Sequence, residues 1–298
     1  MRYIPGFQEY NSGRWVVADL HVHSSYSGGS LSPRELLMLE NSLFLDALAI
    51  ADHHQVAGAR EGEEFSAGNA GCPLVLAAQE VSLGDHFHVL AIGCNDGWPD
   101  GNRNQLLQKI KTHHQSGGII IIAHPWTLPK TSWAAGCLKE MLIEQMIDGI
   151  ELFNSSILEF DQGAELRLRS TWENLILPNS LAIVGGSDFH YHRQGRQIGA
   201  GRTYLKVYRP GIPGIIEALK NRRAVAGLFS YKPFEFGFFG SGQQLIFGND
   251  PWHSQLQDLI NKLHNRIQHR RISRSSLVTK LITAGHYQYA WDLVEAGF

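Results

Sequence analysis

Two histidines stand one residue apart at the end of an apolar run in VVADLHVHSSYSGG, residues 16–29. The run is typical of a β-strand, in which residues two positions apart lie on one face, so His21 and His23 can bind one ion together. Asp19 lies on the same face, one layer further down. Neutral imidazole is a common ligand of Zn, Mn and Fe ions. The stretch therefore indicates a metal site.

Further candidate ligands follow other apolar runs. They lie in the segments ADHH, AQEVS, IIAHP and GGSDFH, and they are His53, Glu80, His124, Asp188 and His190. A single histidine at such a position is more often a packed or surface residue than a ligand. In an α/β fold, however, the carboxyl ends of parallel strands meet at one edge, where sites assemble. The ordered recurrence of these residues at strand ends favours one shared site.

The elements that would position these residues alternate along the chain. Strand-like runs cover residues 15–23, 46–54, 73–82, 118–125, 149–154, 181–190 and 200–208. Helix-like segments lie at about 32–44, 56–67, 102–116, 137–147, 160–175 and 212–223. The first helix has a capping-box pattern, with Ser32 as N-cap, Pro33 at its first position and Glu35. This alternation predicts βα units and a mainly parallel sheet.

Composition limits the classes of partner. The 298 residues are 43% hydrophobic and 18% charged with a net charge of −2, which is typical of a soluble globular protein with a large core and no general attraction to polyanions. Three widely spaced cysteines form no CxxC pair, so we expect a reducing, cytoplasmic setting without disulfides. We expect no signal peptide and no membrane partner, because the longest apolar run is too short to span a bilayer.

The sequence changes character after residue 230. Residues 231–251 are rich in Gly and Phe, and residues 253–268 place Leu256, Leu259 and Leu263 at helical spacing. We therefore expect a barrel-forming domain over residues 1–230, and a loop region with a helical appendage over residues 231–298. A locally basic run at residues 264–274 is more typical of a solvated helix face than of a nucleic-acid contact, because it lacks interleaved aromatic residues.

The motifs together resemble the PHP (polymerase and histidinol phosphatase) superfamily of metal-dependent phosphoesterases. The resemblance covers about residues 15–225 and rests on DLHVHSSYSGGSLSP, IADHHQVAGAREGEEF, AQEVS, IIAHPW and GGSDFH. It implies an α/β fold, namely a distorted (β/α)7, TIM-like barrel with a bi- or trinuclear site at the strand carboxyl ends. It also implies hydrolysis of phosphomonoesters, or of phosphodiesters in small nucleotides and at nucleic-acid ends.

The resemblance also implies how the ligands divide. One ion would be held by His21, His23, Glu80 and Asp188, with Glu80 bridging to a neighbouring ion. His53 and His190 would belong to a second ion and His124 to a third. His88 matches a family histidine of the third set, although packing within its strand is an equal alternative. The cofactors are thus two or three divalent ions of Zn, Mn or Fe.

Gly28 is a departure from the family pattern. The usual family stretch resembles Ser-Asp-Gly, with an acidic or histidine ligand in the middle, whereas this chain has Ser27-Gly28-Gly29. Glycine offers no side-chain ligand, so we expect two firmly bound ions and a third that is weak or absent. Water or the neighbouring His54 could fill the vacant position.

Charge accounting favours phosphate chemistry. Two divalent ions bring more positive charge than Glu80 and Asp188 return, which favours an anionic substrate and the charge of a phosphoryl-transfer transition state. We expect a metal-bound hydroxide to attack phosphorus in line. Asp52 would orient a ligand histidine, or alternatively cap a strand end. His54 or His192 would protonate the leaving group.

Residues near the last motif are candidates for substrate contact. Arg193, Arg196 and Arg202 are expected on a loop that leaves the site, where a guanidinium could bind a phosphate oxygen, or simply be solvated. Trp126 and Trp133 could stack a base, although packing is the favoured role.

Three hypotheses follow. The leading one is a metal-dependent hydrolase of phosphate esters acting on a phosphorylated metabolite or nucleotide. The second, favoured by Gly28, is a metal-binding barrel with little or no turnover. The third is a nuclease that acts at nucleic-acid ends. The sequence leaves open the substrate, the metal, the oligomeric state and the purpose of the last 68 residues.

Overall fold

One mixed sheet organises the computed structural model, which describes residues 12–42, 45–69, 71–84, 87–98, 101–127, 132–154, 174, 177–190, 198–228 and 245–247. The strands are β1 (Arg14–Val22), β2 (Ala47–Ile50), β3 (Leu74–Ser82), β4 (His88–Ile92), β5 (Ile119–Ile122), β6 (Gly149–Asn154), β7 (Ala182–Gly186), β8 (Gly201–Val207), β9 (Ala224–Leu228) and β10 (Leu245–Phe247). Their order in the sheet is β10-β9-β8-β1-β2-β3-β4-β5-β6-β7.

The sheet is less parallel than the sequence indicates. β1–β2, β2–β3, β5–β6 and β6–β7 are parallel pairs. By contrast, β3–β4, β4–β5, β1–β8 and β8–β9 are antiparallel. The prediction of a mainly parallel sheet is therefore wrong, because antiparallel strand pairs are at least as numerous as parallel ones. It missed β4, which follows β3 too closely for a helical crossover, and β9, which pairs antiparallel with β8 although a helix at residues 211–220 lies between them in the chain.

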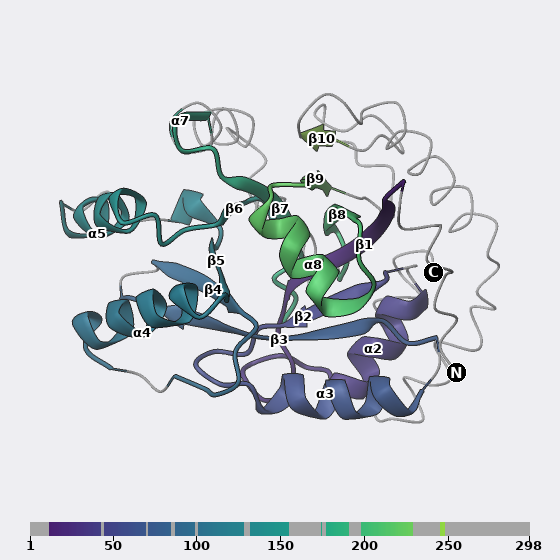
Figure 1. The fold of residues 1–298 in the computed structure, drawn as a ribbon. Coiled ribbons are helices and arrows are strands. Elements are labelled where there is room, and N and C mark those ends of the chain that lie inside the picture. Colours follow the sequence, from purple (N-terminus) through teal and green to yellow (C-terminus); the bar gives the residue numbers. More distant parts are fainter. Residues whose placement is uncertain are drawn as a thin grey trace, which may run out of the picture.

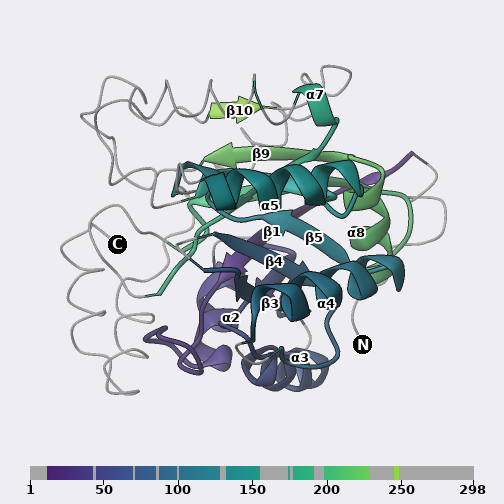
Figure 2. The ribbon, with the colours of Figure 1, turned by 90° about the vertical axis from the view of Figure 1, so that its left-hand side faces the viewer.

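The sheet curls into a nearly closed barrel, as the views in Figures 1 and 2 show. β7 packs against β8 and β9, strands from the other end of the strand order. The backbones of β7 and β8 approach closely because glycines face each other. A Cβ built on Gly201 would lie only 2.0 Å from the carbonyl oxygen of Gly186. The Gly185 N–H donates to Thr203 Oγ1 (2.9 Å), and the Thr203 hydroxyl donates to the Gly185 carbonyl (2.8 Å). The predicted distorted TIM-like barrel is confirmed.

Helices lie outside the sheet (Figures 1 and 2). They are α2 (Pro33–Ser42), α3 (Ala57–Gly68), α4 (Arg103–Gln115), α5 (Ser132–Ile143), α7 (Leu177–Asn179) and α8 (Gly211–Lys220), with a 3-10 turn η1 (Pro125–Thr127). The predicted capping box is confirmed, because Ser32 N–H donates to Glu35 Oε2 (2.9 Å) and Glu35 N–H donates to Ser32 Oγ (3.4 Å). The helix expected at 137–147 begins and ends earlier, as α5.

The predicted helix at 160–175 and the C-terminal appendage lie outside the described residues, apart from Asn174 and β10. The proposed domain boundary near residue 230 therefore stays a prediction. Among the helices that the structure describes, none combines the length and apolar character needed to cross a bilayer.

An apolar cluster closes one end of the barrel. It joins Ile215 and Leu219 of α8 with Ile119 at the start of β5 and Val207 at the end of β8, all at most 2% exposed. This is the end at which the parallel strands begin. Polar groups that the sequence places after the parallel strands therefore lie toward the opposite end of the barrel.

Candidate metal centre

Eight polar side chains gather at the end of the barrel opposite α8. They come from or directly follow β1, β2, β3, β4, β5 and β7, and they are His21, His23, His53, Glu80, His88, His124, Asp188 and His190. Within each of three groups, the ligand atoms all lie within 4.8 Å of one another. The structure thus brings together all eight residues that the sequence analysis selected as metal ligands.

The central group comprises His21, His23, Glu80 and Asp188, all buried. The two histidine Nε2 atoms lie 3.1 Å apart. Glu80 Oε2 is 3.4 Å from His21 Nε2 and 3.1 Å from His23 Nε2. Asp188 Oδ1 is 3.4 Å from both nitrogens. Four potential ligand atoms thus face one small volume.

The second group comprises Glu80, His88 and His124. Glu80 Oε1 lies 2.9 Å from His124 Nε2 and 2.7 Å from His88 Nδ1. Because β4 runs antiparallel to β3, His88 at its start lies opposite Ser82 at the end of β3, near Glu80. The two carboxylate oxygens of Glu80 therefore face two different groups, as a bridging ligand would.

The third group, called here the three-histidine group, comprises His23, His53 and His190. The His23 and His190 rings stack with centroids 4.0 Å apart, and the His23 and His53 centroids are 4.7 Å apart. The His53 side chain is 38% exposed, whereas those of the central group are at most 9% exposed. Burial and neighbouring histidines lower the pKa of His53 to about 4, although Glu80 opposes this. This group lies at the open side of the site.

Glu151 in the middle of β6 is a functional residue that the sequence analysis missed. Its Oε1 lies 3.2 Å from His21 Nδ1, and both side chains are fully buried. A carboxylate only accepts hydrogen bonds, so His21 Nδ1 must be the donor and the lone pair of His21 is on Nε2. Glu151 thereby aims that lone pair into the central group. A lone acidic residue in the apolar strand GIELFN was the only available signal.

Ser27 and Asp52 fix the ring of His23 in the same way. The Ser27 hydroxyl donates to Asp52 Oδ1 (2.9 Å), so its oxygen accepts from His53 N–H (2.8 Å) and from His23 Nδ1–H (3.2 Å). The lone pair of His23 is therefore on Nε2, toward the central group. Asp52 thus acts on His23 through Ser27, one residue further out than the sequence analysis expected.

Thr127 orients His124 by similar logic. Its hydroxyl donates to the His124 carbonyl (2.9 Å) and therefore accepts from His124 Nδ1–H (2.9 Å). His124 Nε2 then faces Glu80 with a lone pair. Asp188 and His124 have positive φ angles, 50° and 25°, which cost non-glycine residues of order 1–3 kcal/mol. Such strain at two neighbouring polar residues is typical of functional sites.

The electrostatics of this end of the barrel require added positive charge. Among the described residues, Asp19, Asp52, Glu80, Glu151 and Asp188 are buried carboxylates, while the only buried Lys and Arg side chains are Lys206 and Arg202. Burial alone would lower the pKa of His21, yet the charges of Glu151, Asp188 and Glu80 raise it well above its usual value. Burial would raise the pKa of Glu80, but His21, His124 and His23 lower it.

The donor set fits divalent metal ions. Asp188 Oδ1 is buried and accepts no hydrogen bond within the described part of the chain. When both rings are neutral, the lone pairs of His21 and His23 face each other and two carboxylates, which is repulsive unless a cation lies between them; the raised pKa of His21 reflects the same demand for positive charge. A divalent cation supplies this charge, and neutral imidazole with carboxylate is a ligand combination that Zn, Mn and Fe accept.

The structure describes one of the two histidines that were predicted to protonate the leaving group. His54 Nδ1 lies 2.8 Å from the Trp98 carbonyl, so it donates, and His54 Nε2 accepts from Ser82 N–H (3.2 Å). Both ring nitrogens are thus engaged with backbone, which disfavours His54 as a leaving-group acid or as a substitute ligand. His192 lies outside the described residues, and its role stays a prediction.

Of the three arginines predicted to bind substrate, the structure describes only Arg202. Arg193 and Arg196 lie outside the described residues. The expectation that Arg202 lies on a loop is wrong: it is in β8, fully buried, and its Nε donates to the Gly199 carbonyl (2.6 Å). All seven residues of β8 are buried, and this position favours a structural role over contact with phosphate. Trp133 packs against the core, with Arg103 4.9 Å from the centre of its ring.

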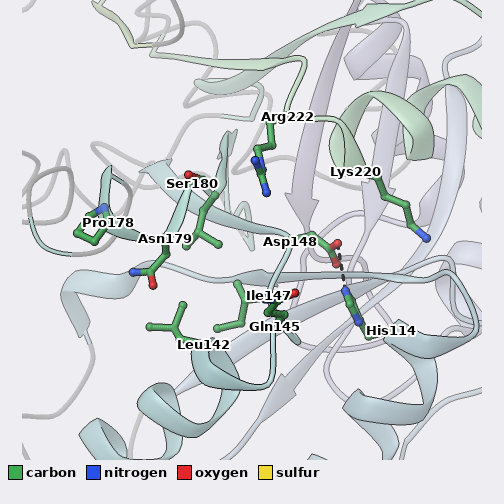
Figure 3. A pocket seen from close by; sticks show the side chains of 11 residues that line it. His114, Leu142, Gln145, Ile147, Asp148, Pro178, Asn179, Ser180, Lys220 and Arg222 are labelled. Carbon is green, nitrogen blue, oxygen red and sulfur yellow. Dashed lines mark hydrogen bonds and ion pairs between the residues drawn. The ribbon is translucent and has the colours of Figure 1, made fainter.

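A separate cleft lies at the opposite end of the barrel, shown in Figure 3. It has a volume of about 540 Å³ and is lined by residues that include Lys220 and Arg222. His114 and Asp148 are its only potential metal ligands, and they are paired with each other, His114 Nε2 lying 3.2 Å from Asp148 Oδ1. Asp148 Oδ2 also accepts from Ile120 N–H (2.9 Å). Within the described residues, the groups of candidate metal ligands therefore lie at the histidine-rich end and not in this cleft.

Comparison with known proteins supports the fold. No family model matches the chain. The structure is similar to that of a two-domain protein from Bacteroides vulgatus that contains a predicted PHP-like metal-dependent phosphoesterase, with a TM-score of 0.56 and 20% identity over 72% of this chain and 65% of that one. The chain shares the fold of that protein. The resemblance seen in the sequence is thus confirmed at the level of the fold.

Two further similarities are weaker. Over 152 residues the chain is 25% identical to the uncharacterized protein MJ1587 of Methanocaldococcus jannaschii, which covers 47% of this chain and 82% of that protein. The lesion-specific endonuclease EndoQ of Pyrococcus furiosus aligns over 70% of this chain and 56% of its own with 16% identity, but its TM-score of 0.42 is too low to support an argument. This chain spans about two thirds of the Bacteroides structure, so activity must be argued from the site itself.

Proposed function

We propose that this PHP-like chain is a metal-dependent phosphoesterase that hydrolyses phosphomonoesters or small nucleotide phosphodiesters with two or three divalent ions of Zn, Mn or Fe. The observation that supports this most strongly is the double use of Glu80. Its Oε2 faces His21 and His23 while its Oε1 faces His124 and His88. One carboxylate between two ligand groups is the arrangement expected for adjacent ions, which in hydrolases bind both the attacking and the leaving oxygen.

Residues of the chain orient the ligand rings, and the ligand groups carry few negative charges. Glu151 orients His21, Ser27 orients His23, and Thr127 orients His124, so the Nε2 atoms of all three rings point inward and offer a lone pair there when the rings are neutral. When bound, the ions lower the pKa of water and polarise a phosphoryl oxygen. Glu80 and Asp188 are the only carboxylates in the three ligand groups, so divalent ions would carry more positive charge than the ligands that contact them return, while Asp52 and Glu151 lie one contact further out. That excess favours a phosphate ester.

The open side of the site sets the direction of approach. The central group is buried, while His53 and the loop residues Ser25, Tyr26 and Gly28 are partly or fully exposed. A phosphate ester therefore reaches the centre past the three-histidine group. The net charge of −2 favours a small substrate over a nucleic-acid polymer, because no overall basic field attracts a polyanion.

Hydrolysis of p-nitrophenyl phosphate and bis(p-nitrophenyl) phosphate by the purified chain tests the proposal. We expect chelation to abolish activity on at least one ester, and Mn or Zn to restore it. Activity that survives complete removal of metal would refute the proposal. Tight metal binding without hydrolysis of either ester, or of a panel of nucleotides and phosphorylated metabolites, would instead support the metal-binding barrel without turnover.

A further inference from the structure

The three-histidine group differs in charge from the two other groups. Its members His23, His53 and His190 are all neutral ligands. Glu80 Oε2 lies 3.4 Å from His53 Nδ1, but it already faces His21 and His23 in the central group. The one lone pair of His23, on Nε2, faces the central group, so an ion here would be bound by His53 and His190 alone; it would keep its full charge and lack at least two ligands.

Gly28 leaves an opening beside this group. Among the residues that the structure describes, a Cβ built on Gly28 would have His190 Cδ2 as its one neighbour within 4 Å, at 3.6 Å, and Gly28 is exposed. The next residue is different, because a Cβ on Gly29 would lie 2.4 Å from the carbonyl oxygen of His23. Of these two neighbouring glycines, only Gly28 therefore leaves room beside His190 for an added atom.

The loop that forms the opening is held in place. Gly29 N–H donates to the Ser24 carbonyl (2.9 Å), and Ser30 N–H donates to the His190 carbonyl (2.6 Å). Ser24 in turn donates through its N–H and its hydroxyl to Asp52, at 2.8 and 2.6 Å. Because the loop is bonded on both sides of Gly28, closing the opening would break these bonds.

We propose that an anionic oxygen of the substrate, from a phosphate group, enters this opening and completes the ligand set of an ion at the three-histidine group. The ion and the phosphate then bind together, whereas the ions at the two groups that contain Glu80 bind without phosphate. This inference rests on the proposed phosphoesterase function and adds that the substrate itself recruits one of the ions.

Thermodynamic linkage makes the inference measurable. If phosphate raises the affinity of the third ion, the third ion must raise the affinity for phosphate by the same factor. Couplings between sites are commonly about 5- to 150-fold, and direct contact between the two ligands favours the upper part of that range. Neither quantity requires turnover, so the measurement is independent of activity.

The experiment titrates the metal-free full chain with Mn²⁺, with and without inorganic phosphate, and counts bound ions by equilibrium dialysis. We expect two equivalents without phosphate and a third, at least about 10-fold tighter, with phosphate. A third ion whose affinity phosphate does not change would overturn the inference. That result would leave the phosphoesterase proposal intact if chelation still abolished hydrolysis, whereas failure to bind any ion would overturn both.

Variants at Gly28 provide the matched test. Its φ of +83° strains any side chain, so Gly28→Asn carries nearly the same strain and volume as Gly28→Asp but lacks the charged ligand. We expect Gly28→Asp to bind three ions without phosphate and to lose most of the coupling, while Gly28→Asn keeps two. Equal ion counts and equal coupling in both variants would contradict the inference. If either variant failed to fold, the coupling in the unaltered chain would still decide it.

Discussion

Glu151 in β6 accepts a hydrogen bond from His21 in β1 across 3.2 Å, although the two residues are 130 positions apart in the chain. The same carboxylate accepts from the backbone N–H of His124 (2.8 Å) and from the Asn154 amide (3.0 Å). Glu151 therefore fixes a ring at the central group and the backbone at the second group. It is a positioning residue, since the ring and the backbone that it holds carry the candidate ligands.

Replacing Glu151 tests this role. We expect Glu151→Gln to weaken metal binding by about 10- to 100-fold, because the amide no longer enforces the Nδ1–H form of His21. Chelator competition measures the affinity, and circular dichroism shows whether the fold is retained. The exposed Glu144, paired with Lys111 on the surface, provides the control Glu144→Gln, which should bind metal normally. Unchanged affinity in a folded Glu151→Gln chain would rule out the positioning role.

The Ser27 hydroxyl supports a second prediction. Ser27→Ala removes the oxygen that links Asp52 to His23 and to the His53 backbone, so His23 loses its orientation and buried Asp52 loses one donor. We expect metal affinity to fall by about 10-fold and stability by about 1–3 kcal/mol. Ser25→Ala, at an exposed position two residues away, is the control. Equal metal affinities for the two variants, measured by the same competition, would show that Ser27 does not act through His23.

Metal removal should lower stability. Glu80 and Asp188 are buried in one ligand group, so bound ions offset the repulsion between two carboxylates that are close together only in the folded chain. At a metal concentration about 100 times Kd, one ion adds about 2.7 kcal/mol, which raises Tm by about 5–10 °C in a domain of this size. Thermal unfolding with chelator and with added Mn or Zn measures the shift. No dependence of Tm on metal would show that the cluster does not bind ions.

Replacing Arg202, with the exposed Arg209 as control, tests whether Arg202 has a structural or a substrate-binding role. Arg202 is fully buried in β8, whereas the Arg209 side chain is 64% exposed near Glu217. We expect Arg202→Ala to lower the free energy of unfolding by about 3 kcal/mol or more and Arg209→Ala to change it by less than about 0.5 kcal/mol. Urea unfolding measures both. A stable Arg202→Ala chain with a raised KM for a phosphate ester would instead support the original substrate-binding prediction.

The candidate ligands could be predicted because their signal is local. A histidine or carboxylate that ends an apolar run is visible in a few residues, and strand ends meet at one edge of the barrel. His88 was uncertain because it begins a strand instead of ending one, and only the antiparallel pairing of β3 and β4 places it beside Glu80.

The supporting residues could not be predicted with the same ease. Glu151 and Ser27 act through hydrogen bonds to particular ring nitrogens, and such bonds depend on the exact approach of distant strands. Arg202 was placed on a loop because basic residues surround it in sequence, while the strand that buries it depends on the close contact of Gly201 with Gly186. Side-chain type identified the site, but tertiary geometry decided the role of each neighbour.

Metal content of purified protein tests the central claim most directly. Elemental analysis of the chain, loaded with Mn or Zn and dialysed, should give at least two ions per chain, and Glu80→Gln should lose at least one because Glu80 faces two ligand groups. The exposed Glu64 on α3 provides the control Glu64→Gln, which should retain all ions. Fewer than one ion in the unaltered chain, or an unchanged count in a folded Glu80→Gln chain, would contradict the account.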